Sequence, residues 1–161
     1  QAQKPKAYMV SDAHLDTQWN WDIQTTIKDY VWNTISQNLF LLKQYPEYIF
    51  NFEGAVKYAW MKEYYPAQYE EMKKFIESGR WHISGASWDA TDTLVPSIES
   101  AIRNIMLGQD YYRKEFGVES TDIFCVGLFR FWLDTSCHCV PLRTDRLLLP
   151  EVAVAQQTVL R

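Results

Sequence analysis

Residues 7–19 read Ala-Tyr-Met-Val-Ser-Asp-Ala-His-Leu-Asp-Thr-Gln-Trp, and this stretch decides the fold. Residues 7–12 form a short apolar and aromatic run that is typical of a buried strand. His14 and Asp16 follow directly at its C-terminal end. A strand that ends in this way can direct an imidazole and a carboxylate toward one metal ion, and Trp19 can provide a flat apolar wall beside it. The stretch therefore predicts half of a zinc site.

Strand-like runs alternate with helical patterns along the chain. We expect strands over residues 7–12, 48–52, 81–84 and 121–125. Apolar residues at helical spacing predict helices over residues 25–44, 66–78 and 97–116. The first helix ends before Pro46, and each of the others ends before a glycine. This alternation favours an α/β fold with a parallel sheet and right-handed crossover connections.

Several polar and aromatic side chains follow the predicted strands. Glu53 ends the second strand, and Trp88, Asp89 and Asp92 come after the third strand. Ligands of parallel sheets bind beyond the C-terminal ends of the strands. We therefore expect these residues to converge with His14 on one edge of the sheet. Without further context, the three acidic residues are interpreted as solvated loop carboxylates.

Three segments resemble the N-terminal part of the catalytic domain of glycoside hydrolase family 38, the retaining zinc α-mannosidases. They are residues 14–19, the loop Gly-Ala-Ser-Trp-Asp-Ala-Thr-Asp at 85–92, and Pro-Ser-Ile-Glu-Ser at 96–100 with the helix behind it. The segments occur in the order and spacing of that family. The resemblance runs from about Lys6 to Cys125.

The resemblance implies a zinc-dependent glycosidase that hydrolyses α-linked mannose and binds mannose-containing glycans. It implies that His14 and Asp16 are zinc ligands and that Trp19 packs against the sugar in the cleavage subsite. Asp92 matches an acidic loop position and is a candidate for substrate contact. The family's fold is an open β/α barrel with seven parallel strands. We therefore expect this chain to form a partial barrel that contains the first four strands.

The implied retaining mechanism needs a carboxylate nucleophile and a second carboxyl group as acid and base, about 5–5.5 Å apart. In the family, an Asp that is both nucleophile and zinc ligand follows the fourth strand, and the remaining catalytic groups lie further along. No Asp stands at the expected place near Gly127. We therefore assign no catalytic residue to this chain and predict that it is inactive as written.

The tail from about residue 126 resembles a coding sequence read in a shifted frame. A permitted coding sequence for residues 127–134, read one base later, encodes Asp-Cys-Phe-Gly-Phe-Gly-Trp, which restores the missing nucleophile segment. The same shift carried to Arg161 resembles the family's continuation throughout. We accordingly divide the chain into a polar lead at 1–6, a mannosidase fragment at 7–125 and an irregular, out-of-frame tail at 126–161.

Two other interpretations stay open at this point. The chain could be a non-catalytic fragment that binds sugar or metal weakly or has no function of its own. It could also belong to a different metal hydrolase on a parallel sheet, such as a deacetylase or a phosphoesterase, which would need a further His or Asp ligand. The cluster Cys137-His138-Cys139 lacks the paired spacing of structural zinc sites, so we do not interpret it as a metal site.

Composition narrows the choice of partners. The chain has 161 residues, of which 47% are hydrophobic, so it can bury a core. A net charge of −4 leaves no basic surface for nucleic acid, and no stretch is long and apolar enough to cross a bilayer. Three Cys, all at position 125 or later, do not form a disulfide framework. The polar start and the family resemblance favour a periplasmic or secreted location.

Overall fold

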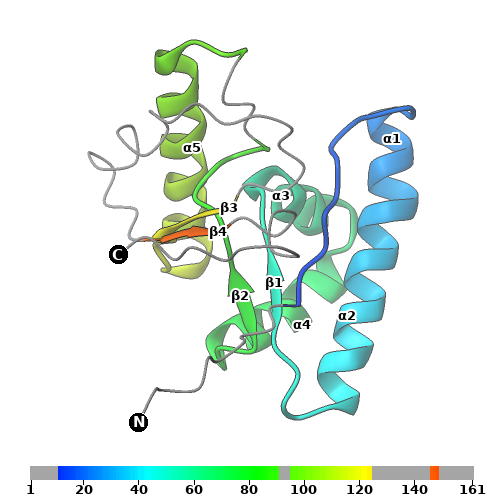
Figure 1. The fold of residues 1–161 in the computed structure, drawn as a ribbon. Helices are drawn as coiled ribbons and strands as arrows, with labels where there is room; N and C mark the ends of the chain where they lie inside the picture. The colour runs from blue at the N-terminus through cyan, green and yellow to red at the C-terminus, as the bar shows by residue number, and fades with distance from the viewer. Residues whose placement is uncertain (1–10, 91–94, 125–145, 149–161) are drawn as a thin grey trace, which may run out of the picture.

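The computed structural model describes residues 11–90, 95–124 and 146–148. Helical segments and short strands alternate along these residues, as Figure 1 shows. The helical segments are α1 (Ile23–Thr25), η1 (Thr26–Val31), α2 (Trp32–Gln44), α3 (Ala55–Tyr64), α4 (Pro66–Glu77) and α5 (Ile98–Phe116). The strands are β1 (Phe50–Phe52), β2 (Trp81–Ile83), β3 (Asp122–Phe124) and β4 (Arg146–Leu148). This alternation confirms the predicted α/β class.

The first sheet contains β1 and β2, which run parallel with Phe50 opposite Trp81. On the other side of β1, Asp12 forms an isolated parallel bridge with Asn51, whose backbone N–H donates to the carbonyl of Ser11 at 2.9 Å. Residues 7–10 of the predicted first strand lie outside the described residues. The described part of that strand thus runs parallel to β1 and carries the chain directly toward His14.

The second sheet pairs β3 with β4, also in parallel, with Asp122 opposite Arg146. The prediction of an irregular tail is therefore wrong for residues 146–148. The physical reason is that an unpaired strand edge offers backbone donors and acceptors to any extended segment, whatever its side chains. Within the described residues the strands form two separate two-stranded sheets, so the partial four-stranded barrel stays a prediction.

One continuous helical rod is formed by α1, η1 and α2. It begins two residues earlier than the predicted residue 25, because Asp22 caps it by accepting a hydrogen bond from the Thr25 backbone N–H at 2.8 Å. Residues 26–31 form a π-helical turn. The hydroxyl of Tyr65 donates to the Ile27 carbonyl in this turn at 2.9 Å. The rod ends at Gln44, as predicted.

The two later predicted helices are also present. Helix α4 begins with Pro66 at its first position, where a missing N–H costs nothing. Helix α5 is capped by the Ser97 side chain and ends at Gly117, whose φ of +65° suits glycine. Helix α3 was not predicted.

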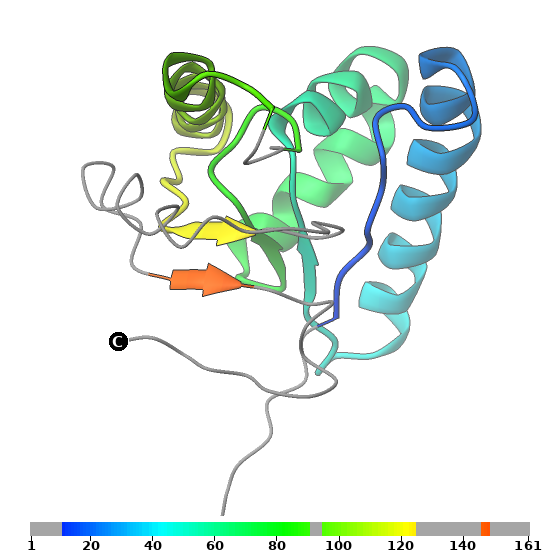
Figure 2. The same ribbon diagram turned by 45° about the horizontal axis from the view of Figure 1, so that its top comes forward.

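Figure 2 shows α2 and α5 at opposite ends of the described structure, with β1 and β2 between them. Within the described residues, no helix is long and apolar enough to span a membrane.

The core beneath the first sheet is largely aromatic. The rings of Phe50 and Trp81 meet edge to face with centroids 4.8 Å apart, and both residues are buried. Tyr58, on α3, is fully buried and joins two strands. Its hydroxyl accepts a hydrogen bond from Trp81 Nε1 at 3.0 Å and donates to the Phe52 carbonyl at 2.9 Å. These contacts fix the C-terminal end of β1, where the candidate site begins.

Candidate functional site

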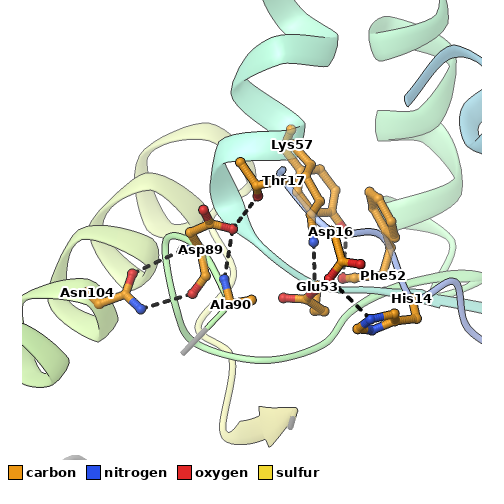
Figure 3. A network of polar contacts seen from close by, with 10 residues as sticks. His14, Asp16, Thr17, Phe52, Glu53, Lys57, Asp89, Ala90 and Asn104 are labelled. Carbon is orange, nitrogen blue, oxygen red and sulfur yellow. Dashed lines mark hydrogen bonds and ion pairs between the residues drawn. The ribbon is translucent and has the colours of Figure 1, made fainter. Parts of the chain in front are cut away.

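His14 and Asp16 lie together just beyond the Asp12 bridge, as Figure 3 shows. Leu15 between them is buried in the core with 7% exposure. In an extended segment, alternate side chains point to opposite sides, so burial of Leu15 turns its two neighbours outward together. His14 Nε2 and Asp16 Oδ1 are 3.3 Å apart, and their side chains are 38% and 34% exposed. The two donor atoms therefore share one accessible position.

This spacing fits two ligands of one zinc ion. Zinc ligands at about 2.0–2.1 Å in tetrahedral geometry have donor atoms roughly 3.3–3.4 Å apart. The observed separation of 3.3 Å matches that edge. Among residues 11–90, 95–124 and 146–148, no group of three or more His, Cys, Asp or Glu side chains could hold a metal ion. Within the described residues, His14 and Asp16 therefore have no third candidate ligand beside them.

Two further carboxyl groups lie near the pair. Burial raises the pKa of Asp12 above its usual value, the charge of His14 opposes this, and the Glu53 carboxylate adds to the rise. Glu53 is 4% exposed, and its Oε1 lies 2.6 Å from Nζ of Lys57, which is fully buried. The interpretation of Glu53 as a solvated carboxylate is therefore wrong. Lys57, four residues along the chain, neutralises it inside the protein.

Asp89 is only partly buried, and its hydrogen bonds give it a structural role as well. Its Oδ1 accepts hydrogen bonds from the Thr17 hydroxyl at 2.5 Å and from the Ala90 backbone N–H at 2.8 Å. Its backbone exchanges two hydrogen bonds with the Asn104 side chain, at 3.0 and 2.9 Å. The expected convergence of the strand ends is thus present between Asp89 and the segment that carries His14 (Figure 3).

The loop that carries Asp89 rests directly on α5. A Cβ atom added at Gly108 would lie 2.2 Å from the Ala86 carbonyl oxygen and 2.6 Å from the Trp88 backbone nitrogen. These distances are far below van der Waals contact, so only glycine allows this approach. Trp88 itself donates its backbone N–H to the Asn104 carbonyl at 2.8 Å. Helix α5 therefore sets the position of the loop.

The aromatic residues after His14 differ in their surroundings. Trp19 is 62% exposed. Trp21 is partly buried, donates its Nε1–H to the Thr26 hydroxyl at 2.8 Å and packs its ring on Tyr30. Asp92, the position near Gly127 and the Cys-His-Cys cluster lie outside the described residues.

A second His–carboxylate pair lies away from this position. His82 on β2 contacts Asp122 on β3, with Nε2 3.2 Å from Oδ2. The His82 side chain is 51% exposed, whereas that of Asp122 is 10% exposed. This pair joins the two sheets. A short His–carboxylate distance alone therefore does not identify a metal site. His14 and Asp16 differ from this pair in their location at the edge of the first sheet and in their flanking residues.

Sequence reasoning proposed His14, Asp16 and Trp19 as candidate site residues, and it did not anticipate the contacts of Thr17, Lys57 and Asn104. Glu53 and Lys57 are opposite charges four residues apart, but Glu53 precedes Gly54, the N-cap of α3, so the helical spacing rule does not predict their contact. The contact between Thr17 and Asp89 spans 72 residues and has no local signal.

Curated proteins with similar sequences are α-mannosidases. Alpha-mannosidase G of Dictyostelium discoideum is 32% identical over 126 residues, which are 78% of this chain and 12% of that protein. Human alpha-mannosidase 2C1 is 29% identical over 120 residues, which are 73% of this chain and 11% of that protein. This chain thus spans only about a tenth of the length of these relatives.

Solved structures share the fold. An α-mannosidase from Enterococcus faecalis V583 matches 87% of this chain and 16% of its own with a TM-score of 0.77 and 20% identity. A 4-alpha-glucanotransferase from Thermococcus litoralis matches 92% of this chain and 23% of its own with a TM-score of 0.65 and 14% identity. The model of the glycosyl hydrolases family 38 N-terminal domain matches residues 4–129, which is most of the chain. The chain therefore belongs to glycosyl hydrolase family 38 and represents a piece of its N-terminal domain.

Proposed function

We propose that the parent protein is a zinc-dependent retaining α-mannosidase and that His14 and Asp16 supply two of its zinc ligands. The observation that carries the proposal is the outward-facing pair, with donors 3.3 Å apart, at the edge of the sheet in a family 38 domain. The similar sequences named α-mannosidase support the substrate class. The substrate would be α-linked mannose in glycans.

Each of several residues of this chain would have a distinct role in such a site. The neutral imidazole of His14 and the ionised carboxylate of Asp16 would bind the metal, which would act as a Lewis acid toward the substrate. Leu15 anchors the segment in the core. The exposed ring of Trp19 offers a flat apolar surface to a sugar face. Asp92 is proposed as a substrate contact on the family resemblance alone.

Zinc affinity tests the ligand assignment. Competition with a chromophoric chelator would be measured for the 161-residue chain and for His14→Ala, with His82→Ala as the matched control. We expect weak zinc binding that His14→Ala reduces by more than about tenfold and that His82→Ala leaves unchanged. Equal affinity in all three proteins would contradict the assignment and favour a fragment without a metal site.

We further propose that the chain as written is catalytically inactive because a shifted reading frame replaced the nucleophile segment. The family match ends at residue 129, close to the proposed shift at about residue 126, which supports this interpretation. Sequencing the coding DNA across codons 125–161 tests it directly. We expect one base to restore Asp-Cys-Phe-Gly-Phe-Gly with an open frame beyond. The restored protein should hydrolyse an aryl α-mannoside, and turnover by the pure 161-residue chain would refute the inactivity.

A further inference from the structure

Hydrogen bonds hold the residue after Asp16 from two sides. The Thr17 hydroxyl donates to Asp89 Oδ1 at 2.5 Å, and the Thr17 carbonyl accepts from the Thr26 hydroxyl at 2.8 Å. One bond uses the side chain and the other uses the backbone. Asp89 lies 72 residues from Thr17 in the sequence, and Thr26 belongs to the helical rod. The segment with the proposed ligands is therefore clamped between the loop after β2 and the helical rod.

Both partners of Thr17 are themselves fixed. Asp89 is held by the Ala90 backbone N–H and by the Asn104 side chain on α5. Thr26 is fully buried in the π-helical turn, and its hydroxyl also accepts from Trp21 Nε1 at 2.8 Å. Neither of these two hydrogen bonds of Thr17, which together form the clamp, thus depends on a freely rotating surface side chain.

We propose that Thr17 and Asp89 are positioning residues for the His14–Asp16 pair. They fix the backbone beside Asp16, so the imidazole and carboxylate donors keep their 3.3 Å separation before a ligand arrives. This inference rests on the proposed zinc role of the pair. Groups outside the ligand shell commonly orient metal ligands in this way. Because the ordering takes place during folding, metal binding does not have to supply it.

Substitutions can distinguish the hydrogen bonds of the clamp from the charge of Asp89. Asp89 acts here as an acceptor for one hydroxyl and one backbone N–H. An Asn at this position keeps an acceptor oxygen of the same shape but carries no charge. Asp89→Asn should therefore preserve the clamp, whereas Asp89→Ala removes it. Likewise Thr17→Ser keeps the hydroxyl donor. Thr17→Val keeps the shape of the side chain but loses this hydroxyl.

The test combines two measurements on the 161-residue chain. The first is zinc affinity by chelator competition, and the second is amide hydrogen exchange over residues 13–18 without metal. We expect Thr17→Val and Asp89→Ala to lower zinc affinity about tenfold and to speed exchange in this segment. Thr17→Ser, Asp89→Asn and the control Thr121→Val, at an exposed position, should remain close to the parent chain. All comparisons are made well below the Tm of each variant.

The outcomes distinguish this inference from the proposed zinc role. If Thr17→Val and Asp89→Ala leave exchange in residues 13–18 unchanged, the positioning role is overturned, whatever happens to zinc affinity. If exchange speeds up while zinc affinity stays constant, the inference is overturned as well, because the pair would not need the clamp. If His14→Ala leaves zinc affinity unchanged in the parent chain, the zinc role fails, and the exchange data still decide whether the clamp orders the segment.

Discussion

Lys57 and Glu53 form an ion pair inside the protein, with Nζ 2.6 Å from Oε1 and side-chain exposures of 0% and 6%. Lys57 lies in the first turn of α3, and Glu53 directly follows β1. The ammonium also lies 5.7 Å from the centroid of the Phe52 ring. Isolated charges are not tolerated at such depth, so each residue depends on the other.

Removal of one partner should therefore destabilise the protein strongly. We expect Lys57→Met to lower the free energy of unfolding by about 3–5 kcal/mol, because the Glu53 carboxylate stays buried without its cation. The double variant Glu53→Gln with Lys57→Met should recover much of this loss. Urea denaturation provides the measurement. Lys73→Met, which breaks an exposed pair with Glu70, is the control and should cost less than about 1 kcal/mol. A similar loss in the control would contradict the argument.

Gly108 should not accept a side chain. A Cβ there would lie 2.2 Å from the Ala86 carbonyl oxygen, so α5 must move away from the loop. We expect Gly108→Ala to cost about 3 kcal/mol, at the upper end for overpacking, and to speed amide exchange in residues 86–90.

Gly117→Ala is the matched control for this substitution. Gly117 has a φ of +65° and no atom within 4 Å of an added Cβ, so only backbone strain of about 1 kcal/mol is expected. Exchange in residues 86–90 should stay unchanged in this variant. The close approach would be disproved if both variants lost the same stability.

The Tyr58 hydroxyl should matter more than its size suggests. Tyr58→Phe leaves Trp81 Nε1–H without this partner inside the core, whereas the Phe52 carbonyl still accepts from the Ser84 backbone N–H. We expect a loss of about 1–3 kcal/mol in thermal or urea unfolding, because buried polar groups without partners are costly. Tyr64→Phe, at a position 46% exposed, should change stability by less than about 0.5 kcal/mol. Equal effects would show that the hydroxyl bridge is unimportant.

Glu115 should contribute a pH-dependent part of the stability. A hydrogen bond from Lys62, helped by the Tyr69 hydroxyl, holds the pKa of Glu115 below its ordinary value of 4.5. The folded pKa is thus lower than the unfolded one, so unfolding takes up a proton in this range. The contribution is present above pH 4.5 and is lost as the pH falls through the folded pKa.

Lys62→Met tests this dependence. Its loss of stability should be at most about 1 kcal/mol at pH 7, because the Lys62 side chain is 53% exposed. The loss should shrink toward zero in acid, where Glu115 is protonated in both states. Urea denaturation at pH 7 and at acid pH measures this loss of stability. A loss that is the same at neutral and acid pH would argue against an ionic origin.

The helices that bury one apolar stripe could be predicted from the sequence. Ile27, Val31, Ile35, Leu39 and Leu42 are all buried, and their spacing alone defines the rod. Helix α3 escaped prediction because its buried positions include Lys57, a residue that normally indicates the solvent side. Its burial follows from Glu53 and not from the helical pattern.

The candidate site divides in the same way. His14 and Asp16 could be proposed as candidates because a two-residue spacing after a strand is a local pattern. The link between Thr17 and Asp89 could not, since it depends on how α5 packs on the loop through Gly108. The partner of β3 was also unpredictable, because strand pairing is governed by backbone edges that side-chain patterns do not describe.

The π-helical turn at residues 26–31 has a consequence for changes in chain length. Such a turn is equivalent to one residue inserted into an α-helix, so the helix on either side keeps its direction and phase. Deletion of one residue inside the turn would return it to α geometry, with Ile35 and Leu39 still facing the core. The same deletion within α2 would rotate the residues beyond it by about 100°. This turn is therefore where the rod can lose a residue without exposing its apolar stripe.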